Sequence, residues 1–361
     1  MSSKFIYIKK IFPGVTLALI FFLFSQGINN VLAIEIFDTP KSPISTVLIA
    51  ILLGILMGNA FTPRPGMMIG LDFTQQYILK LGIICLGIRL SFDEFIKFGS
   101  IAIPLIIVCI IGVLILIKLL IKKVPISSKM SYLIAIGTSV CGATAIVATA
   151  PVINAKKTEI AYAIANITLF GVIAMIVYPY FAEWYFDNNE LKAGLFLGTS
   201  IHETSQVAAA GLIYDQQFNS PETLNVATVT KLIRNTFLVI MIPLFAFLYH
   251  RGNLKSQNYS ILNIFPYFVL GFIGMILFRN IGDQVFPYNS ENYLFWANII
   301  YYLKILATTF LTMAMAAVGI SINLSELKSM GYKPFLVGLI VAVTVGLISL
   351  LYIEILSKFF I

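Results

Sequence analysis

Charged side chains are scarce in this sequence. Asp, Glu, Lys and Arg make up 11% of the 361 residues, while 59% are hydrophobic; a soluble domain carries about 25% charged residues. This composition excludes an ordinary water-soluble domain and predicts an integral membrane protein. The formal net charge of +8 comes from bases at the ends of apolar runs, and no basic patch is interleaved with aromatic residues. We therefore expect a lipid bilayer around the chain and no nucleic acid partner.

Cysteine is also scarce, and motifs for nucleotide or metal chemistry are absent. Cys85, Cys109 and Cys141 lie in apolar segments and have neither the even count nor the spacing of a disulfide framework or a zinc site. No phosphate-binding loop, Gly-x-Ser-x-Gly elbow or His-Glu-x-x-His helix occurs. We expect no enzyme and no cofactor. A carrier coupled to H⁺ or Na⁺ fits better than a nucleotide-driven pump, unless the chain is a membrane subunit of a larger complex.

Long apolar runs, in contrast, fill most of the chain. A run of roughly 18 or more apolar residues can cross a bilayer as a helix. About eleven such runs occur, at residues 11–33, 43–60, 73–90, 100–121, 131–152, 158–181, 193–214, 224–249, 261–278, 296–322 and 334–357. The sequence predicts an all-α membrane protein of about eleven transmembrane helices. Residues 1–42 would form an N-terminal segment and an extra helix, and residues 43–357 a transporter core.

The loops between the apolar runs differ in their content of Lys and Arg. With the N-terminus inside, thirteen of these bases lie on the cytoplasmic side, seven lie outside and four fall within segments. Cytoplasmic loops are enriched in Lys and Arg. The N-terminus is therefore predicted to be cytoplasmic and the C-terminus to lie outside.

Two internal similarities suggest repeats. Residues 86–95 (Leu-Gly-Ile-Arg-Leu-Ser-Phe-Asp-Glu-Phe) resemble residues 318–327 (Val-Gly-Ile-Ser-Ile-Asn-Leu-Ser-Glu-Leu). These copies end segments that run in opposite directions, as in the inverted repeats of secondary transporters; a chance likeness of two exit loops is the alternative. The two halves would be about 43–181 and 193–357.

The second similarity joins two segments that counting places in the same direction. Gly137-Thr-Ser-Val140 resembles Gly198-Thr-Ser-Ile201, and each runs on into an Ala-rich stretch. This pair does not fit the inverted scheme of the first. Either the likeness is convergent, or one of the two segments is not a plain crossing.

The stretch from 198 to 211 carries the most unusual polar residues. His202, Glu203 and Gln206 lie inside an apolar segment, where a charged side chain costs about 2.5–3.5 kcal/mol on insertion scales. Such residues usually face a protein interior or a wet cavity. Burial disfavours the charged forms of His202 and Glu203, which suits either residue to binding a proton or a coupling ion. Local pairing within the core is the alternative.

Two other segments supply candidate ligands for an anion. At 137–144, Gly-Thr-Ser-Val-Cys-Gly-Ala-Thr weakens helix continuity. A half-helix that begins there would direct free N–H groups at an anion. The alternative interpretation is that these small residues form a helix-packing face. Lys231 and Arg234 share a helical face and lie seven to ten residues into their segment. One interpretation is that their side chains snorkel to the membrane interface. The other, which we favour, is that the two bases form a binding site for an anion.

Several motifs resemble one bacterial family of conserved hypothetical inner-membrane proteins, often labelled sulfate exporters. The matching motifs are Cys141-Gly-Ala-Thr-Ala-Ile146, Ala150-Pro-Val-Ile153, Glu159-Ile-Ala-Tyr-Ala163 with Thr168-Leu-Phe-Gly171, Ser200-Ile-His-Glu-Thr-Ser-Gln-Val-Ala-Ala-Ala-Gly211 and Lys231-Leu-Ile-Arg234. The resemblance extends from about residue 45 to 350. The chain departs from the family pattern at Glu203, where Asp is expected, and at Ser205, where Ala is common. The Glu keeps the charge on a longer arm, which puts coordination distances in doubt.

The family is also distantly similar to the bile-acid-symporter and cation–proton-antiporter superfamily. That resemblance implies a core of two inverted five-helix repeats, with two broken helices that cross in the middle of the membrane. The broken helices would be segments 131–152 and 296–322, the second holding Thr308, Thr309 and Thr312. The loop similarity instead pairs 296–322 with 73–90, so the register of the repeats stays open.

These observations predict a multi-pass secondary transporter of a bacterial inner membrane that works by alternating access. The substrate would be a small anion such as sulfate or a sulfonate. The sequence leaves the oligomeric state open, and a homodimer is one possibility. The predicted substrate ligands are Lys231, Arg234, Ser139, Thr138, Thr199, Ser200, Gln206, Cys141 and Asn166. The predicted coupling-ion or proton residues are His202 and Glu203, with no metal site. A cation–proton antiporter, with Glu203 as the sodium ligand, and a non-transporting membrane subunit are the alternatives.

Overall fold

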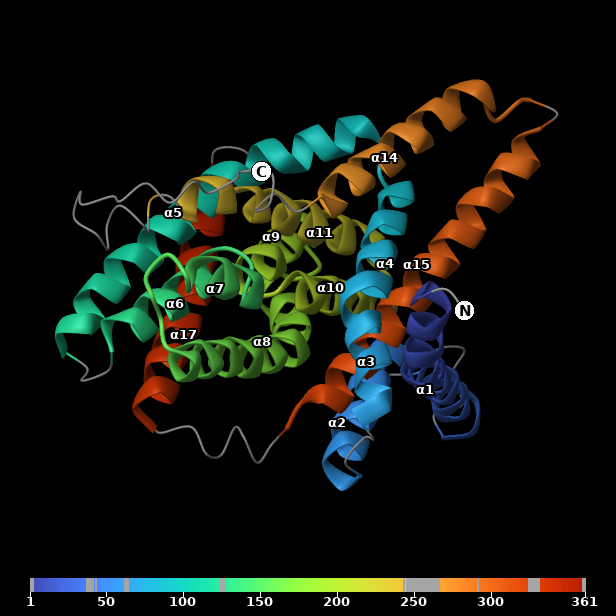
Figure 1. Cartoon of the computed structure of the whole chain (residues 1–361). Helices are drawn as coiled ribbons and strands as arrows, with labels where there is room; N and C mark the ends of the chain where they lie inside the picture. Colours follow the sequence, from blue (N-terminus) through green and yellow to red (C-terminus); the bar gives the residue numbers. More distant parts are fainter. Residues whose placement is uncertain are drawn as a thin grey trace. The chain divides into compact units, whose positions relative to one another are not determined.

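The protein is helical throughout the part that the structure describes. A computed structural model describes residues 3–36, 42, 44–61, 65–123, 127–242, 244, 267–290, 292–323 and 332–358 (Figure 1). Within these ranges the chain forms helices and turns and no strand. This confirms the predicted all-α class.

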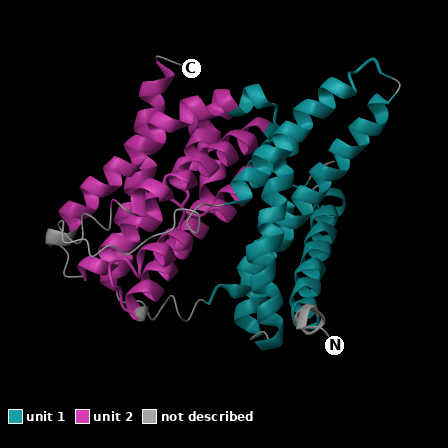
Figure 2. Cartoon of the chain, turned by 45° about the horizontal axis from the view of Figure 1, so that its top comes forward, with its two compact units in different colours: residues 1–95, 212–221, 267–324 teal, residues 96–211, 222–266, 325–361 magenta. Residues whose placement is uncertain are grey.

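The chain divides into two compact units (Figure 2). The first comprises residues 1–95, 212–221 and 267–324. Its helices and helical turns are α1 (Ser3–Val31), η1 (Leu32–Ile36), α2 (Thr46–Ala60), α3 (Pro65–Phe73), η2 (Thr74–Ile78), α4 (Leu79–Leu86), η3 (Gly87–Arg89), α14 (Phe268–Val285) and α15 (Tyr293–Ser321). Gly54 of α2 and Gly319 of α15 bring these two helices into backbone contact, since a Cβ on Gly54 would lie 2.6 Å from the Ala316 carbonyl oxygen.

The second unit comprises residues 96–211, 222–266 and 325–361. Its elements are α5 (Phe92–Lys123), α6 (Ser128–Ser139), α7 (Ala143–Thr149), α8 (Lys157–Phe186), α9 (Glu190–Ser200), α10 (Thr204–Phe218), α11 (Pro221–Thr236) and α17 (Tyr332–Ser357). The first residues of α5 and α11 and the last residues of α10 are assigned to the other unit. Helix α9 packs on α8 and α17, and Gly194 and Gly198 let it approach α11 closely, at Val226 and Thr230.

Seven helices are long and apolar enough to cross a membrane, judged by length and composition over the described residues. They are Lys9–Ile36, Phe92–Leu120, Thr158–Phe186, Pro221–Ile242, Phe268–Val285, Tyr293–Ser321 and Tyr332–Ser357. A multi-pass membrane protein is therefore confirmed, and the count of eleven is not. Four of the predicted segments (43–60, 73–90, 131–152 and 193–214) consist of shorter helices, because hydropathy detects an apolar run and not the continuity of its helix.

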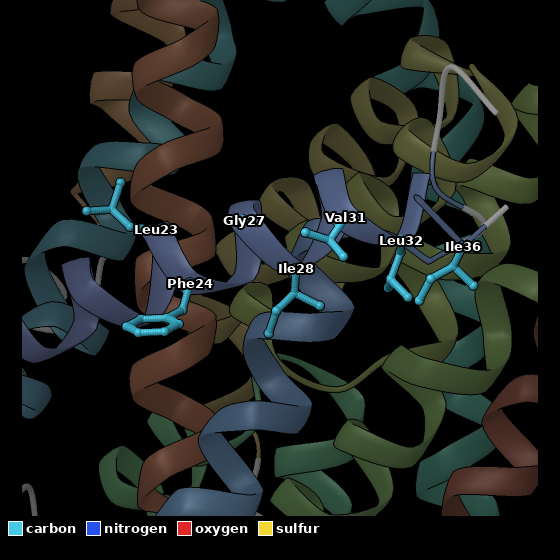
Figure 3. A pocket seen from close by; sticks show the side chains of 7 residues that line it. All are labelled: Leu23, Phe24, Gly27, Ile28, Val31, Leu32 and Ile36. Atoms are coloured by element: carbon cyan, nitrogen blue, oxygen red, sulfur yellow. The ribbon is translucent and has the colours of Figure 1, made fainter. Parts of the chain in front are cut away.

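The outer side of α1 is strongly apolar. A shallow groove of about 550 Å³ runs along α1 and η1 (Figure 3), lined by Leu23, Phe24, Gly27, Ile28, Val31, Leu32 and Ile36. Phe24 is 65% exposed. An apolar surface of this kind suits contact with lipid chains.

One of the two predicted broken helices is assigned wrongly. Helix α15 covers the predicted segment 296–322 and is continuous from Tyr293 to Ser321. The second break instead lies at 201–203, between α9 and α10. Gly and hydroxyl residues end helices more readily than the Ala- and Met-rich sequence of α15 does, so the similarity of Gly198-Thr-Ser to Gly137-Thr-Ser was the better indicator.

The described parts of the two copies of the loop repeat share one backbone hydrogen bond at the equivalent position. The Leu90 N–H donates to the Gly87 carbonyl at 3.2 Å, and the Ile322 N–H donates to the Gly319 carbonyl at 3.1 Å. Each bond closes the last turn of a helical segment at the equivalent position. Residues 324–327 of the second copy lie outside the described residues, and the predicted halves at 43–181 and 193–357 stay a prediction.

Candidate functional site

Two helices of the second unit are interrupted at equivalent positions of the repeated motif. Helix α6 ends at Ser139 and α7 begins at Ala143; α9 ends at Ser200 and α10 begins at Thr204. Aligning the two Gly-Thr-Ser motifs superposes both helix ends and both helix starts. The similarity is therefore structural as well as sequential.

The first break depends on Gly142. This residue has φ +63° and ψ −129°, a conformation that only glycine adopts readily. A Cβ at this position would also collide with the side chain of Glu203. The break thus requires a glycine for two independent reasons.

We predict that Gly142→Ala destabilises the protein by about 1–3 kcal/mol, the usual cost of a strained backbone residue. Thermal unfolding of the detergent-purified protein measures this. Gly27→Ala is the matched control, because a Cβ at Gly27 meets no atom within 4 Å. Equal stability of the two variants would contradict this role of Gly142.

The first break reverses the chain. In a continuous helix, residues 137 and 146 would be separated by roughly 13 Å along the axis. Here a Cβ on Gly137 would lie 3.0 Å from the Ile146 side chain, and α7 packs against α6. Segment 131–152 therefore does not cross the membrane as one continuous helix. Of the two explanations for its likeness to segment 193–214, this supports the one in which one segment is not a plain crossing.

The backbone carbonyls at the two helix ends are satisfied by side chains of α11. The last four carbonyls of a helix lack partners within the helix. Lys231 Nζ donates to the carbonyl oxygens of Val140 at 3.0 Å, Ile201 at 2.9 Å and His202. A lysine ammonium has three donors, so all three are used.

Arg234 binds the same two helix ends one turn further along α11. Its Nε donates to the Ser139 carbonyl at 2.8 Å, and its two terminal nitrogens donate to the carbonyls of Thr138 and Thr199. Lys231 and Arg234 are both fully buried. Each therefore bridges equivalent carbonyls of the two breaks: Arg234 joins Thr138 to Thr199, and Lys231 joins Val140 to Ile201.

This arrangement has a clear electrostatic reason. The C-terminal end of a helix carries roughly half a negative charge, and two such ends meet here. Two buried cations exceed this charge, which leaves a local excess of positive charge before any acidic residue is counted.

Glu203 is the acidic residue at this place. Its carboxylate accepts the Ala143 N–H at 3.2 Å, at the start of α7, and it lies within electrostatic range of Lys231. It forms no ion pair within the described residues, and it is intermediate in burial as a residue. A carboxylate in such a position can exchange a proton or a cation.

Most of the other predicted ligands are engaged in local hydrogen bonds. The Thr199 hydroxyl bonds to the Leu195 carbonyl and the Ser349 hydroxyl, and the Ser200 hydroxyl to the Phe196 carbonyl. His202 is buried with its Nδ1 3.2 Å from the Ser200 carbonyl. These contacts stabilise the second break and leave few free groups for a ligand.

Three predicted residues close the cluster or lie beside it. Gln206 accepts the Glu203 N–H at 3.2 Å and donates to the Thr168 carbonyl at 3.4 Å, which fixes the start of α10. Cys141 is buried within electrostatic range of Lys231. Asn166 is directed elsewhere, since its amide donates to the Pro334 carbonyl at 2.7 Å.

Some residues of the cluster carried little or no signal in the sequence. Val140 and Ile201 contribute carbonyl oxygens, which no side-chain pattern reveals. Thr204 accepts the Asn235 amide at 2.9 Å and is partly exposed. The one sequence feature that could have indicated the Thr204 contact is Asn235, a polar residue next to Arg234 in an apolar segment. Ser139 keeps a buried hydroxyl without a hydrogen-bond partner among the described residues.

Fold and cluster together define a multi-pass membrane protein with two interrupted helices joined by buried cations. The sequence matches the family described as conserved hypothetical protein 698 over residues 15–338, and the chain belongs to this family. It is 37% identical over 290 residues to a UPF0324 membrane protein of Streptococcus agalactiae serotype V, covering 80% of this chain and 83% of the relative. It is 32% identical over 304 residues to the UPF0324 inner membrane protein YeiH of Escherichia coli, covering 82% and 81%.

A UPF0324 membrane protein of Fusobacterium nucleatum is 33% identical over 321 residues, covering 88% of this chain and 91% of the relative. No solved structure matches the chain. These relatives confirm the predicted membership of a conserved hypothetical membrane family. Their names state membrane location and give no substrate, so the similarity to the symporter and antiporter superfamily stays a prediction.

Proposed function

We propose that this protein is a secondary transporter that carries a small anion across a bacterial inner membrane by alternating access. The observation that carries the proposal is the pair of helix breaks bridged by Lys231 and Arg234. Interrupted helices within a membrane are tolerated where they line a site or cavity. Counted with the two helix C-terminal ends, the two buried cations and Glu203 nearly balance, so a proton on Glu203 leaves a net positive charge at the breaks.

The two cations would act on the anion at a distance in the conformation described here. All three Lys231 donors and three Arg234 nitrogens are bonded to carbonyls. Direct contact would be made by the first-turn N–H groups of α10 and by Thr204. Thr204 Oγ1 accepts the Asn235 amide, and a hydroxyl that accepts one hydrogen bond can still donate its proton to a ligand.

Glu203 supports proton coupling of this transport. A proton on its carboxylate removes the negative charge from the cluster and raises the positive potential that an anion meets. Proton and anion binding would then favour each other, and both would move together. Sulfate or a sulfonate is the proposed substrate class.

Exchange of a cation for protons is the second candidate, and the Glu203 carboxylate is the observation that favours it. Glu203 is intermediate in burial as a residue and has no ion-pair partner in the described part of the chain. In that case Na⁺ and H⁺ would compete for Glu203, and no anion would be needed.

Thermal stabilisation by a panel of anions separates the two candidates. A ligand that binds only the folded protein adds about 2.7 kcal/mol of stability at 100 times its Kd. We expect sulfate or a sulfonate to stabilise the wild type, and Thr204→Val to lose this stabilisation. Because Thr204→Val also removes the acceptor of the Asn235 amide, the effect of the anion is measured relative to the stability of the same variant without ligand. Thr344→Val, at an exposed hydroxyl bonded within α17, is the control. Stabilisation by Na⁺ and by no anion would reject the anion proposal.

A further inference from the structure

The first unit contains a second group of basic residues that the proposed transport site does not use. Arg89 of η3, Arg279 of α14 and Lys304 of α15 form this basic cluster, because Lys304 lies within electrostatic range of the other two. Arg279 also donates to the Ile88 carbonyl at 3.2 Å, which holds α14 against the segment of Arg89.

The acidic residues at this place do not neutralise the basic cluster. Arg89 pairs with Asp215 at 2.7 Å and Arg279 with Asp283 at 2.6 Å. Asp283 is shared further with the Trp296 indole N–H at 2.7 Å. Lys304 forms no ion pair within the described residues, so three cations face two carboxylates.

Two donors of the basic cluster are available to an anion. The Arg89 Nε is buried and has no hydrogen-bond partner among the described residues. Lys304 is exposed and forms no ion pair among the described residues. The acidic residue within its electrostatic range is Asp215, which already pairs with Arg89. A phosphate group has the oxygen atoms that such donors bind.

The position along α15 places Lys304 at the level of lipid headgroups. Seventeen residues separate it from Ser321 at the end of α15, about 26 Å of helix, which approaches the thickness of a bilayer core. Its neighbours Tyr301 and Tyr302 are 59% and 67% exposed. Exposed tyrosines are enriched at the membrane–water interface.

An apolar groove adjoins the basic cluster. It has a volume of about 610 Å³ and is lined by Gly271, Gly274, Met275, Phe278, Ile299, Tyr302 and Leu303. Phe278 and Leu303 directly precede Arg279 and Lys304 in the sequence. A Cβ on Gly87 would lie 2.9 Å from the Met275 side chain, so the groove also borders the segment of Arg89.

We propose that the basic cluster and the groove between α14 and α15 bind one anionic phospholipid. The phosphate would lie on Lys304, Arg279 and the free Arg89 donor, and an acyl chain would occupy the groove. Charge complementarity selects the headgroup and the apolar lining selects the chain. This site is independent of the proposed transport function and can be tested without it.

The test is a binding titration on the detergent-purified full chain, read by native mass spectrometry. The probes are phosphatidylglycerol, phosphatidylethanolamine, glycerol 3-phosphate and inorganic phosphate. We expect phosphatidylglycerol to bind more tightly than the other three. Lys304→Gln should weaken its binding about fivefold, since one base near the membrane surface contributes about that factor.

Two further variants keep the test specific. Lys80→Gln removes an exposed lysine that lies over Tyr77 on the same unit and should bind phosphatidylglycerol as the wild type does. Gly274→Leu places a side chain in the groove at a position where a Cβ meets no atom within 4 Å, and it should weaken phosphatidylglycerol binding. Unchanged binding by Lys304→Gln overturns the proposal. Equal affinity for inorganic phosphate or phosphatidylethanolamine also overturns it, since the first indicates a free-anion site and the second a site without charge selection.

Discussion

Arg234→Met is expected to lower the free energy of unfolding by at least about 3 kcal/mol. The substitution removes three charge-assisted hydrogen bonds, each contributing about 1.5–3 kcal/mol, and leaves buried carbonyls of Thr138, Ser139 and Thr199 without donors. Methionine replaces the aliphatic part of the buried side chain but is shorter than arginine, so the loss combines the missing guanidinium donors with the space that they leave. Unfolding of the detergent-purified protein, followed by tryptophan fluorescence, measures the change.

Lys192→Met is the matched control for this prediction. Lys192 also belongs to the second unit, but its side chain is partly exposed and its contact with Glu354 is long, at 3.4 Å. Pairs of this kind contribute about 0–1 kcal/mol. If Arg234→Met and Lys192→Met are equally stable, the bridge between the two helix breaks does not hold the cluster together.

Glu203→Gln is expected to abolish proton-driven accumulation of the anion. Glutamine keeps an oxygen that can accept the Ala143 N–H, so the local structure should survive, but it cannot carry a proton. With the membrane potential clamped at zero, a gradient of one pH unit supports about a tenfold anion gradient if one proton moves with each anion. Vesicles containing the wild type should reach this ratio, and those containing Glu203→Gln should only equilibrate.

The control for the Glu203 prediction is Glu354→Gln. Glu354 lies in the second unit with its side chain 41% exposed, and its substitution should leave accumulation unchanged. Wild-type accumulation by Glu203→Gln would show that the proton is carried elsewhere. Na⁺-dependent proton flux that is lost in Glu203→Gln, without any anion requirement, would favour the cation–proton exchanger.

The residues of the cluster could be predicted from the sequence better than their contacts. Isolated polar residues in apolar runs are costly, which identified Glu203, Lys231 and Arg234 as residues that need partners. The partners are mainly backbone carbonyls, such as those of Val140 and Ile201. Any amino acid supplies a carbonyl, so no side-chain pattern could indicate that the two bases bridge helix ends.

The positions of the two breaks could be predicted only in part. The Gly, Ser and Thr residues at 137–144 predicted the first break. The likeness of Gly137-Thr-Ser to Gly198-Thr-Ser was visible in the sequence, but no break was predicted at 198. The resemblance to a superfamily instead placed the second break in 296–322, where α15 is continuous. Reversal of the chain at the first break depends on the backbone angles of Gly142, and a glycine alone does not specify which of its allowed conformations it adopts.

The central claim is that the bridged helix breaks form the transport site of a small anion. The most direct test is the entry of labelled sulfate into vesicles that contain the purified protein and are preloaded with unlabelled sulfate. We predict saturable exchange above protein-free vesicles, lost in Thr204→Val and retained in Thr344→Val. Exchange of neither sulfate nor a sulfonate by a folded wild-type protein would contradict the claim.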